Sequence, residues 1–319
     1  MCTAIWDAGE RTLIGRTLDL EYSLDERIVL TPRNYPMEYL YERRDSSHFA
    51  VLGVATVKNG IPLYYDAMNE YGLCALGLNF PKYCRYGRAL EGAKNIASFE
   101  VIPMILSRCK SVDEAENLLS GATVTDDSFS EELPATPLHW MVADRKRCIT
   151  VESGDRGLII YENPVGVLTN SPDFPYHLTR LADYRGLCPT TPENKLSDHS
   201  PAVYSRGMGA IGLPGDYSSS SRFVRAVFVK SHTSRTSESV SRFFHVMDSV
   251  KVPLGCIKCD SGKDVSTVYT SCADPEDEIY YYTTYGSRGI HGVAFDRELI
   301  SESEIKIYPL SHKESIELS

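Results

Sequence analysis

The second residue of the 319-residue chain, Cys2, combines two groups that can do chemistry together. A cysteine is small enough for the initiator methionine to be removed before it, so we expect the mature chain to begin at Cys2. The thiol and the α-amine, with reference pKa values of about 8.5 and about 7.7–8.0, would then share one residue, and the amine could act as general base for the thiol. The alternative is a structural cysteine, because free cysteines are mostly small buried hydrophobes.

The strand expected next in the chain carries charged residues that suit such a thiol. A hairpin turn centred near residues 8–9 would place Gly15 or Arg16 opposite Cys2, with Asp19 slightly beyond. A guanidinium favours thiolate over thiol, and a carboxylate can hold the ammonium form of the α-amine. The alternative is a surface ion pair between Arg16 and Asp19, because residues three apart in a strand lie on opposite faces unless the strand bends.

Two asparagines at the ends of apolar strands are candidates for stabilising an oxyanion. Asn79 ends the run 76–79, and Asn170 ends the run 167–170. Side-chain amides can donate hydrogen bonds to a developing negative charge, and one such donor contributes about 3–4 kcal/mol to a transition state. Asparagine before a turn is also common for local reasons, so neither residue is diagnostic by itself.

The elements that must position these residues follow the order β, α, β, α, β along the chain. The expected strands are Cys2–Trp6, Arg11–Leu18, Arg27–Pro32, Phe49–Val57, Pro62–Met68, Leu73–Leu78, Leu138–Ala143, Cys148–Glu152, Gly157–Glu162, Val165–Thr169, Val265–Cys272, Glu278–Tyr285, Gly292–Phe295 and Ile305–Tyr308. Asn59-Gly60 predicts a type I′ hairpin. Helices are expected after Ser98, after Ser111, and over Ser219–Lys230 and Ser237–Val250.

This order of elements predicts an α+β fold in which two sheets are covered by two helical layers, rather than alternating βαβ units. Residues 171–218 are expected to be turn-rich, and no linker divides the chain. We therefore expect residues 2–319 to form a single domain.

Composition and charge exclude several classes of protein. The 33 Lys and Arg against 43 Asp and Glu give a net charge of −10, which argues against nucleic acid as a partner. No apolar run is long enough to cross a membrane, and the N-terminus does not resemble a secretory signal. The nine irregularly spaced cysteines favour free thiols in a reducing cytoplasm.

Other candidate sites carry less weight. Cys256 and Cys259 form a lone CxxC, and zinc would need two further ligands at matching spacing. His139 lies in an apolar strand and is expected to be a core residue. We expect no metal site and no cofactor.

Several stretches in the same order along nearly the whole chain resemble the choloylglycine hydrolase family, most closely its bile salt hydrolases. The matching stretches are Met1–Thr3, Gly15–Asp19, Asp66–Leu73, Gly77–Pro81, Leu138–Trp140, Leu168–Pro172, Gly212–Tyr217 and Ser221–Arg225. The resemblance implies a four-layer αββα sandwich of two antiparallel sheets between helical layers, the N-terminal-nucleophile hydrolase fold. It also implies the catalytic residues Cys2, Arg16, Asp19, Asn79, Asn170 and Arg222.

The resemblance further implies a role for each of these residues. Cys2 would be the nucleophile after removal of Met1, with Arg16 against the thiol and Asp19 hydrogen-bonded to the α-amine. Asn79 and Asn170 would form the oxyanion hole and orient the scissile amide. Arg222 would complete the charged site.

The implied reaction is hydrolysis of the amide bond in glycine- or taurine-conjugated bile salts, through a thioester. Arg16 and Asn79 would contact the substrate, and Leu18, Leu20 and Tyr22 would line the sterol slot, although ordinary packing would equally explain these apolar residues. Residues 123–137 would form a mobile entrance loop. The resemblance also implies a homotetramer.

The sequence also fits other functions. A penicillin V acylase or an N-acyl homoserine lactone acylase is the alternative enzyme; penicillin V acylases of the family often carry Tyr where this chain has Asn79. A bile-acid-binding protein without catalysis is the alternative outside enzymes, and the intact set of Cys2, Arg16 and Asp19 argues against it.

Overall fold

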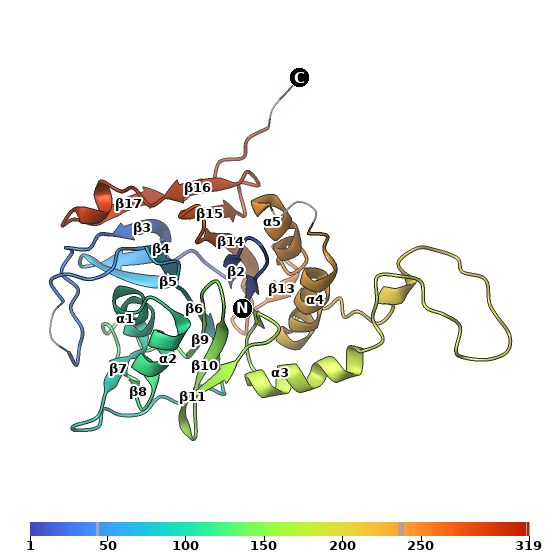
Figure 1. The fold of residues 1–319 in the computed structure, drawn as a ribbon, viewed down its shortest axis with the longest axis horizontal. Helices are drawn as coiled ribbons and strands as arrows, with labels where there is room; N and C mark the ends of the chain where they lie inside the picture. Colours follow the sequence, from blue (N-terminus) through green and yellow to red (C-terminus); the bar gives the residue numbers. More distant parts are fainter. Residues whose placement is uncertain (43–44, 236–238, 317, 319) are drawn as a thin grey trace.

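Two antiparallel sheets lie face to face at the centre of the protein, with helices on both outer sides (Figure 1). The computed structural model describes residues 1–42, 45–235, 239–316 and 318. The first sheet has the strand order β12-β1-β2-β14-β15-β16, with β13 paired to β14, and the second has the order β11-β10-β9-β6-β5-β4-β3-β17. The chain therefore folds as the four-layer αββα sandwich that the sequence predicts.

The strands of the first sheet are β1 (Cys2–Asp7), β2 (Leu13–Leu20), β12 (Val167–Leu168), β13 (Ile257–Lys258), β14 (Asp264–Asp274), β15 (Ile279–Thr284) and β16 (His291–Ala294). Those of the second sheet are β3 (Arg27–Thr31), β4 (Val51–Lys58), β5 (Ile61–Asn69), β6 (Cys74–Asn79), β9 (Leu138–Ala143), β10 (Cys148–Gly154), β11 (Gly157–Glu162) and β17 (Lys306–Pro309). A separate parallel pair joins β7 (Asn95–Ala97) to β8 (Thr123–Thr125).

The helices form the two outer layers. Packed on the second sheet are α1 (Val101–Arg108) and α2 (Val112–Leu119), whereas α4 (Ser219–His232) and α5 (Val240–Asp248) cover the first sheet and α3 (Phe174–Arg180) contacts α4. One apolar cluster fills the space between the sheets and under α4 and α5, and a second lies between the second sheet and α1. No helix among the described residues is long and apolar enough to cross a membrane.

Local signals predict most elements to within two residues. Asn59 and Gly60 have φ values of 52° and 81°, as the expected type I′ turn requires. Ser111 accepts a hydrogen bond from the Glu114 amide and caps α2. Pro103 is the third residue of α1, where its missing N–H leaves no intrahelical bond unmade. The start of the helix expected at 237 lies outside the described residues.

Two expectations about the irregular segments are wrong. Residues 171–218 contain α3, which begins after Asp173 with Pro175 in its first turn, a position that proline tolerates. Residues 123–125 belong to β8 rather than to a loop, because they pair with β7. From residue 185 to residue 218 the chain forms an arm that extends away from the sandwich, with the single short helix Met208–Ala210 (Figure 1, yellow).

The register of the first hairpin also differs from the expected one. Cys2 pairs with Leu18, and Arg16 pairs with Ala4, because five residues connect β1 to β2 instead of a tight turn. Gly15 therefore does not lie opposite the thiol. A Cβ at Gly15 would come within 1.9 Å of the Ser271 carbonyl oxygen, so this glycine permits the close approach of β2 to β14.

Candidate active site

Cys2 begins the β1 strand at the centre of the sandwich and is only 2% exposed. Its sulfur accepts a hydrogen bond from the Arg16 guanidinium on the neighbouring strand β2. Strand alternation places both side chains on the face of the first sheet that looks toward the second sheet. The thiol therefore lies between the two sheets, beside a permanent positive charge.

The guanidinium of Arg16 bridges the two sheets and is itself 1% exposed. Its Nε donates to the Thr17 carbonyl at 3.2 Å, and its Nη1 donates to the carbonyls of Tyr65, at 3.2 Å, and Gly77. Tyr65 is the extra residue of a β-bulge in β5, and β6 is no longer paired to β5 at Gly77, so both carbonyls are free of that ladder. Irregularities of the second sheet thus supply the acceptors that fix this arginine.

The electrostatic surroundings keep Arg16 charged. Burial alone lowers the pKa of the guanidinium, but Cys2, Tyr269 and Asp66 together raise it above the usual value. A guanidinium that stays protonated at every physiological pH favours the thiolate of a sulfur that it contacts. The expected role of Arg16 against the thiol agrees with this geometry.

A second buried arginine reaches the start of the chain from the opposite side. Arg222 on α4 donates to the carbonyl of Cys2 and, at 2.7 Å, to the hydroxyl of Thr3. Its Nη2 donates to Oδ1 of Asn170 at 2.7 Å. Burial lowers the pKa of Arg222, although Asp19 and the sulfur of Cys2 oppose this effect. The first residues of β1 are thus held between two guanidinium groups.

Asn170 lies just beyond β12 and is oriented by four hydrogen bonds. Its Oδ1 accepts from the backbone nitrogen of Cys2 at 2.9 Å as well as from Arg222. Its Nδ2 donates to the carbonyl of Asn79 at 2.7 Å, and its own carbonyl accepts from Nε2 of His177 at 2.8 Å. The side-chain oxygen therefore faces the nitrogen that would become the α-amine, while one Nδ2 hydrogen remains for another acceptor.

The carboxylate of Asp19 lies near the site but contacts other groups. It accepts hydrogen bonds from Thr267, at 2.7 Å, and from Thr17, at 3.3 Å, on the face of β2 opposite to Arg16. Its backbone N–H donates to the Met1 carbonyl at 2.9 Å, and its carbonyl accepts from the Met1 amine at 2.6 Å. In the chain that retains Met1, the described hydrogen bonds of the Cys2 nitrogen involve Asn170 and not this carboxylate.

The residues expected to bind substrate lie along one path from the sulfur outward. Asn79 is half-buried at the end of β6, and none of the described hydrogen bonds uses its side-chain amide. Leu18 is buried in the apolar cluster, directly opposite Cys2, and Leu20 packs against the edge of that cluster. Tyr22 is 52% exposed, with the ammonium of Lys263 5.9 Å from its ring centroid. The strand β2 and its continuation thus run from the thiol to the surface.

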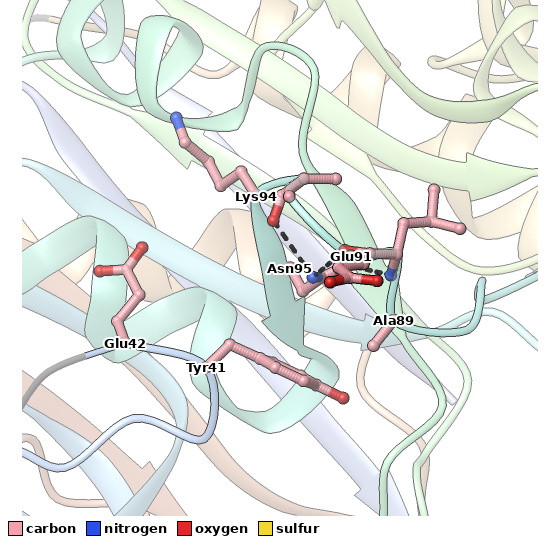
Figure 2. A pocket seen from close by; sticks show the side chains of 9 residues that line it. Tyr41, Glu42, Ala89, Glu91, Lys94 and Asn95 are labelled. Atoms are coloured by element: carbon pink, nitrogen blue, oxygen red, sulfur yellow. Dashed lines mark hydrogen bonds between the residues drawn. The ribbon is translucent and has the colours of Figure 1, made fainter.

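The two described cavities lie away from the thiol. One, of about 520 Å³, lies between Tyr41 and Glu42 and the loop 89–95 (Figure 2), where the Asn95 amide is already hydrogen-bonded to Leu90 and Ala93. The other, of about 370 Å³, lies between the segment 35–40 and Phe99 and Phe129. Neither is lined by a residue of the expected site.

No metal centre is found among the described residues, where no three His, Cys, Asp or Glu side chains gather. Cys256 and Cys259 flank the short strand β13, the first exposed and the second half-buried. His139 is fully buried, and its two ring nitrogens contact Glu152 and the Thr169 carbonyl.

Two residues that the sequence argument did not single out also hold the site together. Asp66 lies 3.9 Å from Arg16 and forms a salt bridge with it. His177 supports the backbone of Asn170 and stacks on Phe223. Asp66 belongs to a stretch that carries the family resemblance, but His177 falls within α3, where no helix was expected, so no pattern pointed to its role.

Comparison with known proteins agrees with this geometry. The buried thiol of Cys2 contacts Arg16 at the first strand of an αββα sandwich, and the backbone nitrogen of the same residue donates to Asn170. These features suit a cysteine amidase. The family described as linear amide C–N hydrolases, choloylglycine hydrolase family, matches residues 2–308, and the chain belongs to this family.

Among its relatives, a bile salt hydrolase/transferase of Lactiplantibacillus plantarum is 43% identical, with 97% of each chain covered. A bile salt hydrolase/transferase of Clostridium perfringens is 36% identical over 95% of this chain and 94% of the relative. The crystal structure of the C2A mutant of the conjugated bile acid hydrolase of C. perfringens superimposes with a TM-score of 0.94 at 35% identity, covering 100% of this chain and 99% of that one. A penicillin V acylase of Agrobacterium tumefaciens, 19% identical with a TM-score of 0.76, shares the fold.

The support that His177 gives to Asn170 predicts a pH-dependent stability. Burial lowers the pKa of His177 to about 4, so the folded side chain is neutral at pH 7 and Nε2 carries the proton donated to Asn170. The unfolded chain protonates near pH 6.5. The neutral, buried His177 therefore contributes to the free energy of unfolding above pH 6.5. This contribution is lost as the pH falls toward 4, by up to about 3 kcal/mol.

Urea unfolding at pH 6.5 and pH 4 would measure this loss. We expect His177→Gln, whose amide can still donate a hydrogen bond but does not titrate, to lose less stability than the wild type over this interval. Equal losses in the two proteins would contradict the assignment of a neutral His177 in the folded state.

Proposed function

We propose that this enzyme hydrolyses the amide bond of glycine- or taurine-conjugated bile salts with Cys2 as the nucleophile. The observation that carries the proposal is the buried contact between the sulfur of Cys2 and the guanidinium of Arg16. The substrate class is supported by the names of the relatives, which include two bile salt hydrolases/transferases and a conjugated bile acid hydrolase, each covering most of the chain.

Removal of Met1 is the first requirement of the proposed mechanism. While Met1 is present, the nitrogen of Cys2 is part of a peptide bond and cannot act as a base. Its loss would free the backbone N–H and carbonyl of Asp19, which now bond to Met1. The new α-amine would keep the oxygen of Asn170 as a partner and would lie at the strand end where Asp19 is located.

The acylation step begins with transfer of the thiol proton to the α-amine, and Arg16 stabilises the resulting thiolate. The thiolate attacks the amide carbonyl, and the side-chain amides of Asn79 and Asn170 stabilise the oxyanion. The C–N bond then breaks, and the leaving glycine or taurine takes its proton from the α-ammonium. The product is a thioester between the bile acid and Cys2.

Hydrolysis of the thioester completes the cycle. The α-amine, neutral again after protonating the leaving group, accepts a proton from water, which attacks the thioester carbonyl. Collapse of the second tetrahedral intermediate releases the free bile acid and returns the sulfur to Arg16. Each proton lost by one partner is gained by another, so the cycle consumes only water.

We propose that the sterol lies along β2. Leu18 and Leu20 would contact the steroid, with Tyr22 near the entrance and with Asn79 and Arg16 at the amide end. This placement is supported by the sequence of burial along the strand, from the core residue Leu18 to the exposed ring of Tyr22. The rim would be polar on one side, since the ammonium of Lys263 lies over that ring.

We also propose a domain organisation and a location in the cell. Residues 2–319 would act as one domain, because a single apolar cluster contains residues of both sheets and of α4. A cytoplasmic location is supported by the nine cysteines, all of which are free thiols.

A substrate panel tests the proposed activity and its closest alternative. We expect purified enzyme to release taurine or glycine from conjugated bile salts faster than it releases the side chain of penicillin V or of an N-acyl homoserine lactone. Cys2→Ser should reduce all of these rates to the background while bile salts still bind, and Cys188→Ser, in the arm 185–218, should leave them unchanged. Intact mass should show a chain without Met1.

Two results would contradict this account. A faster rate with penicillin V or the lactone would contradict the proposed substrate but not the assignment of Cys2 as the nucleophile. Hydrolysis by Cys2→Ser at a rate near that of the wild type would contradict the assignment of Cys2 as the nucleophile. Binding of bile acid by the wild type without any hydrolysis would favour a binding protein.

We also propose a homo-oligomer, with a tetramer as the expected form. The arm 185–218 supports this proposal because it projects from the sandwich (Figure 1). It also carries exposed apolar side chains. Leu196 is 91% exposed and Tyr204 is 80% exposed. Large apolar side chains gathered on a projecting segment are typical of a surface covered in an assembly.

Light scattering coupled to size-exclusion chromatography tests the assembly. We expect the wild type to have about four times the chain mass of 35.6 kDa. The double variant Leu196→Ser/Tyr204→Ser should have a smaller mass, with unchanged circular dichroism as the control for folding. A monomeric wild type, or a variant with the same mass as the wild type, would contradict the role of the arm.

A further inference from the structure

Asp66 on β5 is a buried carboxylate that three hydroxyl groups of the opposite sheet surround. It is 2% exposed. Its Oδ1 accepts a hydrogen bond from the hydroxyl of Tyr269, and its Oδ2 accepts from Ser271, at 2.6 Å, and from Tyr280. Since β14 and β15 carry these donors, the carboxylate ties the second sheet to the first.

The hydroxyl groups favour the ionised form of this carboxylate. Hydrogen bonds donated to a carboxylate stabilise its charged state. The two tyrosines stay neutral donors, because burial and the neighbouring Asp66 raise the pKa values of Tyr269 and Tyr280 well above 10. Both oxygens of Asp66 thus accept hydrogen bonds from hydroxyl groups that stay protonated, an arrangement that suits a carboxylate between the sheets.

The same carboxylate lies beside the guanidinium that contacts the nucleophile. Oδ1 of Asp66 is 3.9 Å from Nε of Arg16, too far for a hydrogen bond but close enough for strong Coulomb attraction in a buried site. The N–H groups of Arg16 are directed at backbone carbonyls and at the sulfur of Cys2. Asp66 thus balances the charge of this arginine without competing for its donors.

A count of the buried charges shows what this balance achieves. Arg16 and Arg222 are positive, and Asp19 and Asp66 are negative, so these four groups sum to zero. The Cys2 pair is also neutral overall, whether it is thiol and amine or thiolate and ammonium. The proton can therefore move between sulfur and nitrogen without a change in the net charge of the buried site.

We propose that Asp66 is a positioning residue for the amidase reaction, the permanent counter-ion of Arg16 in every state of the Cys2 sulfur. This inference rests on the proposed function, because it concerns the same nucleophile. In the thioester the sulfur carries no charge, and of the two carboxylates that act on the buried guanidinium of Arg16, Asp66 has a larger effect than Asp19. Asp66 supplies an anion beside Arg16 before, during and after acylation.

Removing the charge of Asp66 should make the sulfur the main anion beside Arg16. The carbonyls of Thr17, Tyr65 and Gly77 still hold the guanidinium in place, so the thiolate gains stability relative to the neutral thiol. An over-stabilised thiolate is a weaker nucleophile, since nucleophilicity falls with basicity. The change should therefore be visible in the thiol itself and in the acylation rate.

Alkylation of Cys2 by iodoacetamide as a function of pH tests the proposal. The mature wild type is compared with Asp66→Asn and Asp66→Ser, which remove the charge of the carboxylate. The control is Tyr280→Phe, which removes one hydrogen bond to Asp66 but keeps its charge. Mass spectrometry of the peptide that begins at Cys2 gives the rate at each pH. We expect the pH at which the alkylation rate reaches half its maximum, the alkylation midpoint, to fall by about one unit in the two charge-removing variants. The same variants should lose tenfold or more in kcat/KM.

The control should behave differently from the charge-removing variants. Tyr280→Phe should lose thermal stability but keep its alkylation midpoint within a few tenths of a unit of the wild type. A purely structural Asp66 would give lower stability and an unchanged midpoint in all three variants, and that result, or a rise of the midpoint in Asp66→Asn, would overturn the proposal. Because alkylation needs no bile salt, this test does not depend on the proposed substrate.

Discussion

The structure depends on the burial of two guanidinium groups around the first strand. Arg16 and Arg222 are both removed from solvent, and a buried charge is tolerated only with partners in good geometry. Arg16 is satisfied by carbonyls of both sheets and by the sulfur of Cys2, while Arg222 is satisfied by groups at the start of β1 and by Asn170. The site and the packing of the sandwich therefore stabilise each other.

Departures from regular structure provide the acceptors for these charges. The bulge at Tyr65 and the end of β5–β6 pairing before Gly77 turn two carbonyls toward Arg16. A register shift in β14 between Thr267 and Tyr269 lies next to the same region and lets one side chain face Asp19 while the other faces Asp66. Irregular strand pairing at an active site is thus a functional feature of this fold.

The sequence predicts much of the fold, but less of the site's geometry. Strong local signals such as Asn59-Gly60 and the capping Ser111 gave the right elements, because their physics is contained within a few residues. The predicted register of β1 against β2 is wrong by two to three residues, because five residues rather than a tight turn connect the two strands. Five of the six site residues are candidates from residue type and position along the chain, whereas Arg222 is implied only by the family resemblance.

Residues that act through long-range contacts could not be predicted from local pattern. Asp66 meets its three hydroxyl partners only when β5 faces β14 and β15, about 200 residues later in the chain. His177 supports Asn170 from α3, where Pro175 in the helix and Pro172 before it indicate turns in the sequence. In each case the role depends on packing between elements that are far apart in the sequence, and no local residue pattern indicates that they pack together.

In the proposed mechanism, Arg16 stabilises the thiolate that Cys2 forms in a buried site. The most direct measurement is the ultraviolet absorbance of the thiolate during a pH titration of the mature protein, with Cys2→Ala subtracted to isolate this one thiol. We expect the thiolate of Cys2 to form at a lower pH in the wild type than in a folded Arg16→Met variant, because the guanidinium favours the thiolate. Identical titration curves for the two proteins would contradict it.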